Sequence, residues 1–346
     1  MGSQKILLSS IRIDVTFLTN LIQTIGIPYS ALVSIVFGLM IVSFPIGAYV
    51  VFNSELGDDI DFGFPLEKFD IFIAGINMEL PFEYQIGDAF IILWSFFIIL
   101  FSISLLGPKK NFLSTINSLL SKEKNFIDSN YLITIIKWFS VLVVVSGVIN
   151  FIQESFGIVT QPPESSNDLI LFLAVTIAPI TEEIGFRVML IGLPLFAIYS
   201  YRSSFRTFFK ALWHPYQNLD IPEHKKAILI IIAVGIFFGA AHIISGEPWS
   251  NGKFAQAAAS GIIIGWVYYR YGLISAILIH WATNYFIFSY VFMISEVNGI
   301  SIDSAISHSM INTLEIILVV TGIVSIAVII MNFINSKNES EITNTP

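Results

Sequence analysis

Two adjacent glutamates and an arginine interrupt an apolar stretch of this 346-residue chain, in the order Glu182, Glu183 and Arg187. On a helix, Glu183 and Arg187 are one turn apart and can form an ion pair, which offsets the cost of burying either charge. Glu182 has no cation at helical spacing, so it is a candidate general base for activating a water molecule. The alternative is a purely structural role, in which these polar side chains only hold neighbouring helices together.

Two further polar groups lie in apolar segments downstream. Phe238 and His242 are four residues apart beside glycine and alanines, and His280 and Asn284 have the same spacing. Residues four apart share a helix face, so His280 and Asn284 can direct two donors at one developing negative charge, as an oxyanion hole requires. Taken singly, His242 is typical of a packing histidine, and the His280–Asn284 pair is equally typical of hydrogen bonding between helices.

The absence of certain residue types excludes several catalytic mechanisms. The chain has no cysteine, no serine in a G-x-S-x-G setting and no aspartate pair on its apolar segments, so covalent and aspartyl mechanisms lack their residues. One or two Glu and two His could bind zinc, but the H-E-x-x-H spacing of helical zinc sites does not occur. We therefore expect catalysis without a cofactor and keep zinc as the alternative.

The elements that carry these residues are apolar enough to span a membrane. Hydrophobic residues make up 55% of the chain and charged residues only 12%, about half of what a soluble domain carries. The composition predicts an all-α, polytopic membrane bundle, since a spanning helix needs about 20 apolar residues. We expect eight spans, at about 31–52, 89–107, 131–152, 168–200, 226–245, 254–270, 272–292 and 311–334.

The remaining segments divide the chain further. Residues 1–30 mix apolar and charged positions up to a break at Pro28, which favours an interfacial segment with no removable signal peptide. Residues 31–334 form the membrane domain, with a motif core at 168–292, and residues 335–346 are polar and expected to be disordered. Loops 53–88 and 201–226 are acidic and basic respectively. Gly261 and Gly265 in the sixth span favour close packing inside the bundle over dimerisation.

The loop charges predict an orientation. With eight spans and the N-terminus inside, thirteen of the seventeen Lys and Arg fall on one side, while loop 53–88 places nine acidic residues on the other. This is the positive-inside pattern, and it predicts a multi-pass cell-membrane protein with both termini cytoplasmic. The chain has no basic stripe, so nucleic acid is not an expected partner.

The three groups, EExxxR (Glu182, Glu183, Arg187), FxxxH (Phe238, His242) and HxxxN (His280, Asn284), resemble the ordered motifs of the CPBP family. That family contains the type II CAAX prenyl endopeptidases of the Ras-converting-enzyme type and bacterial Abi-type immunity proteins. The resemblance covers about 168–292, with all three motifs complete. The long basic loop between the first two motifs is a departure that could alter access or partners.

The resemblance implies an intramembrane endopeptidase that cuts near the C-terminus of prenylated or other membrane-anchored peptides. Glu182 would be the base and His242 would help to orient the water, while His280 and Asn284 would stabilise the oxyanion. Glu183 and Arg187 would position their helix or hold substrate, and Phe238 would contact substrate. Access would be cytoplasmic or lateral from lipid, and the bilayer is the expected environment of a protein that we take to be a monomer.

Two other classes stay open. An Abi-type immunity or scaffold protein would use the same polar groups for assembly only. A transporter would use them as an ion path, although the chain shows no inverted repeat. On straight, perpendicular helices the motif residues would lie at different depths in the membrane, with Glu182 about 21 Å and His242 about 8 Å from the same side. Tilt, the Pro179 break or an extended fourth helix would be needed to bring them together.

Overall fold

The computed structural model describes residues 15–61, 85–120, 130–158, 167–200, 204–244 and 251–343. These residues are almost entirely helical, and none of them belongs to a β-strand. The elements are α1 (Val15–Asn53), η1 (Glu55–Asp59), α2 (Ile86–Leu106), α3 (Phe112–Leu120), α4 (Tyr131–Ser155), α5 (Asp168–Glu182), η3 (Glu183–Gly192), α6 (Leu193–Tyr199), α7 (Phe205–Trp213), α8 (Pro215–Asn218), α9 (His224–Ile244), α10 (Lys253–Tyr271), α11 (Leu273–Trp281), η4 (Ala282–Phe286), α12 (Ile287–Asn298), α13 (Ile302–Ile306) and α14 (Ser309–Thr343).

The fold is the predicted all-α membrane bundle. Within the described ranges, seven helical segments are long and apolar enough to cross a membrane. They are Thr24–Asn53, Ile86–Leu106, Tyr131–Ser155, Asp168–Tyr199, His224–Ile244, Leu273–Asn298 and Ser309–Ile334. The expected sixth span is also a helix, α10, but it is less apolar than the seven. Its sequence explains the difference, because α10 is rich in alanine and glycine and packs along α9, α11 and α4 rather than facing lipid.

The predicted break at Pro28 is wrong, because α1 runs without interruption from Val15 to Asn53 through both Pro28 and Pro45. A proline removes one backbone donor, and membrane helices tolerate this loss when serine or threonine side chains and neighbouring helices satisfy the freed groups. Here the Ser30 hydroxyl donates to the Ile27 carbonyl at 2.7 Å. Residues 15–30 therefore belong to the same helix as the first candidate span, which begins at Thr24, and residues 1–14 lie outside the described residues.

Two polar segments that were expected to be irregular contain helix. The segment after Phe333 continues α14 to Thr343, because extending an existing helix adds a hydrogen bond per residue without the cost of nucleation. The basic segment 201–226 contains α7 and α8 and the start of α9. Most of the acidic loop 53–88 lies outside the described residues, although η1 occupies its beginning.

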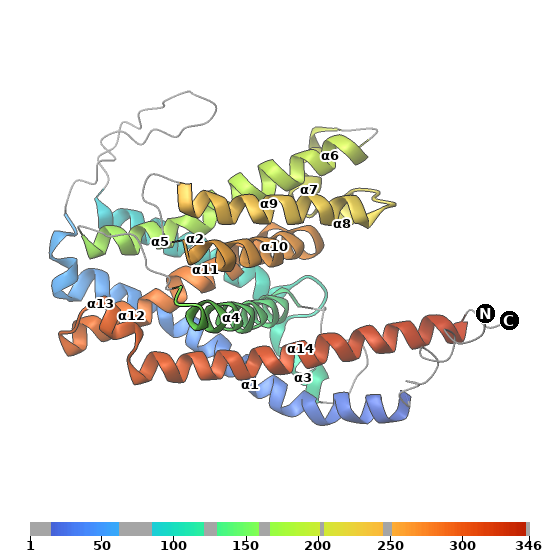
Figure 1. The fold of residues 1–346 in the computed structure, drawn as a ribbon, viewed down its shortest axis with the longest axis horizontal. Helices are drawn as coiled ribbons and strands as arrows, with labels where there is room; N and C mark the ends of the chain where they lie inside the picture. Colours follow the sequence, from blue (N-terminus) through green and yellow to red (C-terminus); the bar gives the residue numbers. More distant parts are fainter. Residues whose placement is uncertain are drawn as a thin grey trace.

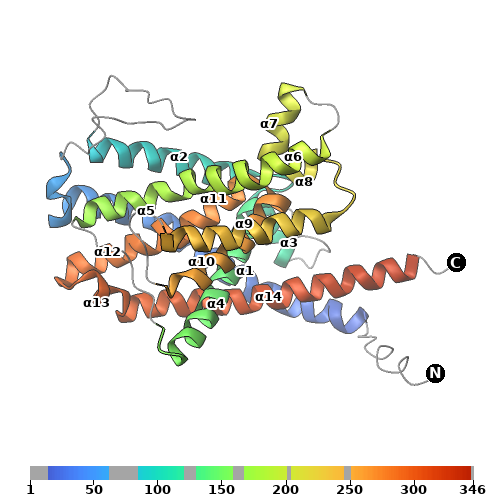
Figure 2. The same ribbon diagram turned by 45° about the horizontal axis from the view of Figure 1, so that its top comes forward.

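The helices alternate in direction between two ends of the bundle. Figure 1 shows the start of α1 and the end of α14 at one end, with α12 and α13 at the opposite end. Figure 2 gives the same arrangement from a second angle and places α7 and α8 at the end where the termini lie. We call these the terminal end and the far end of the bundle.

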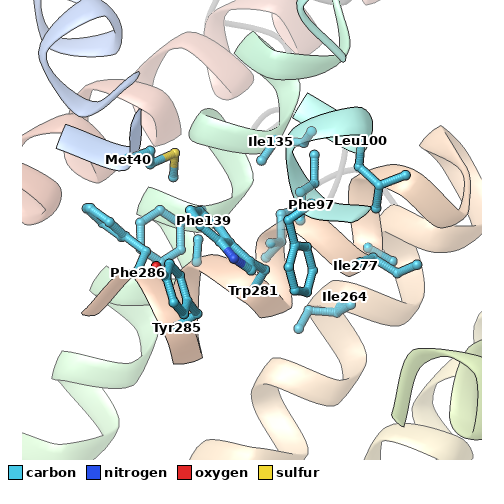
Figure 3. Packing of buried hydrophobic residues seen from close by; sticks show 14 of the residues in the cluster. Met40, Phe97, Leu100, Ile135, Phe139, Ile264, Ile277, Trp281, Tyr285 and Phe286 are labelled. Atoms are coloured by element: carbon cyan, nitrogen blue, oxygen red, sulfur yellow. The ribbon is translucent and has the colours of Figure 1, made fainter. Parts of the chain in front are cut away.

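An aromatic core fixes the segment Leu273–Asn298 against α1, α2 and α5. Figure 3 shows Trp281, Tyr285 and Phe286 of this segment among other buried side chains. Trp281 is fully buried and stacks on Phe44 of α1 with 5.3 Å between ring centroids. Tyr285 stacks on Phe172 of α5 at 5.5 Å, and its hydroxyl donates to the Ser43 carbonyl at 3.1 Å. Because these rings are buried on three sides, the helix that carries His280 and Asn284 cannot rotate without losing several large contacts.

Small residues bring α9 and α10 into backbone contact. A Cβ added to Gly235 would lie 2.7 Å from the Ile262 backbone nitrogen, and one on Gly261 would lie 3.0 Å from the Gly235 Cα. A Cβ on Gly265 would meet Ile231 of α9 at 3.1 Å. The glycine pair in α10 therefore packs inside the bundle, as expected from the sequence.

Candidate active site

Two of the three motifs lie on π-helical turns. The EExxxR residues fall at the junction of α5 with η3, and Asn284 falls within η4. The local sequence favours a wider turn at η3, because Pro194 lacks a backbone donor and follows directly, and the Leu193 N–H bonds the Val188 carbonyl five residues back. Such insertions are frequent at functional sites, since they redirect side chains that a regular helix would place elsewhere.

Glu183 is completely buried and joins two other motif residues. Its Oε2 lies 3.1 Å from Arg187 Nε, and its Oε1 accepts a hydrogen bond from His280 Nδ1 at 2.7 Å. The Arg187 guanidinium is also buried, with its Cζ 4.5 Å from the centre of the Phe238 ring. A buried charge is tolerated only with such compensation, so Glu183 and Arg187 form a structural pair that also orients His280.

Glu182 occupies a different environment from its neighbour. About 30% of its side chain is exposed, against 0% for Glu183, and it lines a cavity. Its Oε2 is 3.7 Å from His280 Nε2, which is within ion-pair range but too long for a hydrogen bond. Of the two carboxylates, only Glu182 can contact a water molecule in the cavity.

His280 lies between the two glutamates and beside Asn284. Because a carboxylate can only accept, His280 Nδ1 carries a hydrogen toward Glu183, which leaves Nε2 facing Glu182 and Asn284. Asn284 Nδ2 is 3.4 Å from Nε2, a long contact. The Thr283 hydroxyl donates to the His280 carbonyl at 2.8 Å and lies 3.4 Å from Asn284 Oδ1, so it supports the orientation with the amide NH₂ toward the histidine.

Phe238 holds the second histidine beside this group. His242 Nδ1 donates to the Phe238 carbonyl at 2.9 Å, so the neutral ring has Nε2 as an acceptor. The Phe238 ring packs edge-on against His242 at 4.6 Å and against His280 at 6.1 Å between centroids. Phe238 is itself only 3% exposed and packs against Phe186 and Arg187 as well as the two histidines.

These side chains meet at one cavity of about 750 Å³. Its lining includes Glu182, Phe238, His242, His280 and Asn284, so residues from all three motifs share one space. Glu183 and Arg187 lie behind the wall. The depths that looked incompatible on straight helices do not keep these residues apart: Glu182 at the end of α5 and His242 near the end of α9 line the same cavity.

Several polar residues of the cavity wall, among them Lys253, Gln256 and Thr283, were not singled out from the sequence. Lys253 and Gln256 line the cavity from the first turn of α10, and Thr283 lines it beside Asn284. The Gln256 side chain donates through Nε2 to the side-chain oxygen Oδ1 of Asn150 in α4 at 3.4 Å. The sequence could have drawn attention to Lys253, because it is one of only two lysines on the acidic side of the predicted topology. Gln256 and Thr283 belong to no motif, and their role depends on helix packing.

The donor set does not fit a zinc ion. Within the described ranges, no three His, Asp or Glu side chains are grouped as they would be around a metal. Glu183 is occupied by the Arg187 guanidinium and by His280 Nδ1, which leaves a cation where a second carboxylate ligand would be needed. No chemical step is therefore assigned to a metal.

The site coincides with a recognisable family segment. Residues 165–286 match the family described as type II CAAX prenyl endopeptidase Rce1-like. Comparison with curated proteins and with solved structures finds no match. The match runs from the start of α5 through η4 and contains every motif residue, so the resemblance inferred from the motifs is confirmed. The chain is a multi-pass membrane protein whose site-bearing segment, residues 165–286, matches the Rce1-like type II CAAX prenyl endopeptidase family.

Proposed function

We propose that this protein is a glutamate-dependent intramembrane endopeptidase that hydrolyses a peptide bond near the C-terminus of a membrane-anchored peptide, prenylated or otherwise lipid-linked. The observation that carries the proposal is the difference between the two adjacent glutamates. Glu182 lines the cavity, whereas Glu183 is buried against Arg187 and His280. A scaffold needs a buried ion pair to hold its helices, but it has no use for a second carboxylate exposed to a cavity beside two histidines.

The reaction follows from the residues that face the cavity. Glu182 accepts a proton from a water molecule as the water oxygen bonds to the scissile carbonyl carbon. The carbonyl π electrons move to the oxygen, and they return when the carbon–nitrogen bond breaks. The proton held by Glu182 then passes to the leaving amine nitrogen. His242 accepts a hydrogen bond from the same water through Nε2 and orients it.

The oxyanion is stabilised by groups on η4 and the end of α11. Asn284 offers an amide N–H that is not used by Thr283, and His280 Nε2 lies beside it and donates to the oxyanion when that nitrogen carries a hydrogen. Glu183 holds the His280 ring through Nδ1, and Arg187 holds Glu183. Phe238 acts chiefly as a positioning residue, since its ring packs against both histidines and the guanidinium.

The proposal includes the setting of the enzyme. The charge distribution supports a cell-membrane protein with both termini cytoplasmic, and the two termini lie at the same end of the bundle (Figure 1). Hydrolysis proceeds without a metal, nucleic acid has no part in it, and the monomer contains the complete site. The bilayer is the solvent of the apolar helix faces.

Cleavage of a labelled peptide by purified protein tests the function. Three peptides of one sequence are compared: C-terminally prenylated, acylated near the C-terminus, and unmodified. We expect cleavage of at least one anchored peptide, little of the unmodified one, and no loss of activity after exhaustive chelation. Zinc-restored activity would overturn the metal-free mechanism, and failure to cut any anchored peptide would overturn the peptidase assignment.

A further inference from the structure

The short helix α7, at the terminal end of the bundle, exposes a row of three large aromatic residues. Phe205, Phe209 and Trp213 follow one another at intervals of four residues, so they lie along one side of the helix. They are 81%, 54% and 49% exposed, and the Phe205 and Phe209 rings pack edge to face at 4.8 Å between centroids. Single exposed apolar residues need no explanation, but a continuous aromatic row marks a surface that something apolar covers.

The opposite side of α7 is fixed to the bundle. Ala211 and Leu212 are buried, and the Leu212 carbonyl accepts a hydrogen bond from the Tyr268 hydroxyl of α10 at 2.7 Å. A Cβ on Gly272, between α10 and α11, would lie 2.9 Å from the Trp213 carbonyl oxygen. Turning α7 about its axis to bury the aromatic row would break these contacts. The row therefore belongs to the surface of the folded protein.

Two cations lie beside the aromatic row. Arg206 and Lys210 are exposed, each one position after a phenylalanine of the row, and α7 contains no acidic residue. Its nine residues are too few to cross a bilayer, and Figure 2 shows α7 steeply inclined to α5, α9 and α14. Aromatic rings beside Lys and Arg are typical of a helix that lies along the membrane interface.

We propose that α7 is an interfacial helix that binds anionic phospholipid headgroups of the leaflet at the terminal end of the bundle. The aromatic row enters the upper acyl region, and Arg206 and Lys210 contact the phosphates above it. Charge complementarity selects this occupant, because the loop charges predict the terminal end as the cytoplasmic side, where anionic lipids give the membrane a negative surface. A symmetric contact between two copies through this face would instead bring like charges together.

The depth of the aromatic row can be measured with a spin label, because the chain has no cysteine to compete for it. The label is attached at Phe209→Cys on the row and, as an aqueous reference, at Asp220→Cys, an exposed position beyond α8. The protein is placed in nanodiscs of phosphatidylcholine and phosphatidylglycerol. Relaxation is measured with oxygen, which concentrates in hydrocarbon, and with a water-soluble nickel chelate. We expect the ratio of oxygen to nickel collisions to be at least about threefold higher at Phe209→Cys.

Neutralising the cations tests the headgroup preference. Arg206→Gln/Lys210→Gln is compared with Lys225→Gln/Lys226→Gln, which removes two exposed cations from the start of α9. Tm is followed by tryptophan fluorescence in nanodiscs of phosphatidylcholine alone and of phosphatidylcholine with phosphatidylglycerol. Phosphatidylglycerol should raise the Tm of the unsubstituted protein and of the α9 variant alike, by about 4 °C. The rise should be less than half as large in the α7 variant.

Each other result overturns the inference. A label at Phe209→Cys that collides mainly with nickel would place the aromatic row in water. A label shielded from both reagents would show that protein covers the row, and dipolar broadening between labels would identify that protein as a second copy. Equal losses in the two double variants would reduce the lipid effect to general surface charge. Neither measurement needs catalysis, so these results and the cleavage of a peptide stand or fall separately.

Discussion

Substitution of the two adjacent glutamates, one at a time, is predicted to affect activity and stability separately. Replacing either residue with glutamine removes one negative charge and keeps the shape of the side chain. Glu182→Gln changes a partly exposed group on the cavity wall, whereas Glu183→Gln changes a fully buried group with two charged or polar partners. The first variant should lose catalysis and keep its fold, and the second should lose stability.

The magnitudes follow from these contacts. Removing one partner of a buried ion pair costs about 3–5 kcal/mol, because the remaining charge is left uncompensated; here that charge is Arg187, 1% exposed. At about 2 °C per kcal/mol for a large domain, Tm should fall by roughly 6–10 °C. Glu182→Gln should change Tm by no more than about 2 °C. Loss of a general base should lower kcat by about 10²–10⁴-fold.

The assay combines unfolding with cleavage of the anchored peptide in the same detergent. The six tryptophans report unfolding by intrinsic fluorescence, which is needed because a thiol-reactive dye has no site in this chain. A third variant, Glu183→Gln with Arg187→Met, removes both buried charges. It should recover most of the lost Tm, because an apolar replacement of a buried pair is often neutral. Its activity should stay about 10–100-fold low, since His280 has lost its carboxylate partner.

The reasoning is refuted if the two single variants behave alike. A stable, inactive Glu183→Gln beside an active Glu182→Gln would exchange the two roles. Full activity in Glu182→Gln would remove the base from the mechanism and favour a role in assembly. An unchanged Tm in Glu183→Gln would show that the Arg187 charge is compensated by something other than this carboxylate.

Three further predictions concern the oxyanion donor, the helix contact and a buried histidine. Asn284→Ala should lower kcat by about 10²–10³-fold with little change in KM, as measured on the anchored peptide. Gly239→Ala places a Cβ 2.8 Å from the Phe254 carbonyl oxygen and should lower both Tm and activity by separating α9 from α10, whereas Gly38→Ala, with nothing within 4 Å, should be neutral in both assays. Burial lowers the pKa of His214 to about 4, so the folded protein binds fewer protons than the unfolded chain between pH 6.5 and 4. Tm should therefore fall as the pH falls through that window. The variant His214→Phe should show a weaker dependence of Tm on pH.

Much of the bundle could be predicted from the sequence because the bilayer imposes a strict requirement on helix length. All eight predicted spans are helices, and seven meet the length and composition of a spanning segment. The remaining span, α10, is sixth in chain order, and its hydropathy is too low to identify it as a spanning helix. A helix enclosed by other helices can carry alanine and glycine in place of large apolar residues. The predicted helix ends failed for a related reason. Pro28 and the polar residues after Phe333 locally favour the end of a helix, but in both places a helix that has already formed continues through them.

The sequence indicated which motif residues would share one cavity, but not the contacts that they make there. Helical spacing gave the Glu183–Arg187 pair, which the structure contains at 3.1 Å. It could not show that His280 hydrogen-bonds Glu183, because those residues are on different segments and meet only through packing. The depth calculation assumed straight α-helices, and it could not foresee that η3 and η4, which contain Glu183 and Asn284, are π-helical.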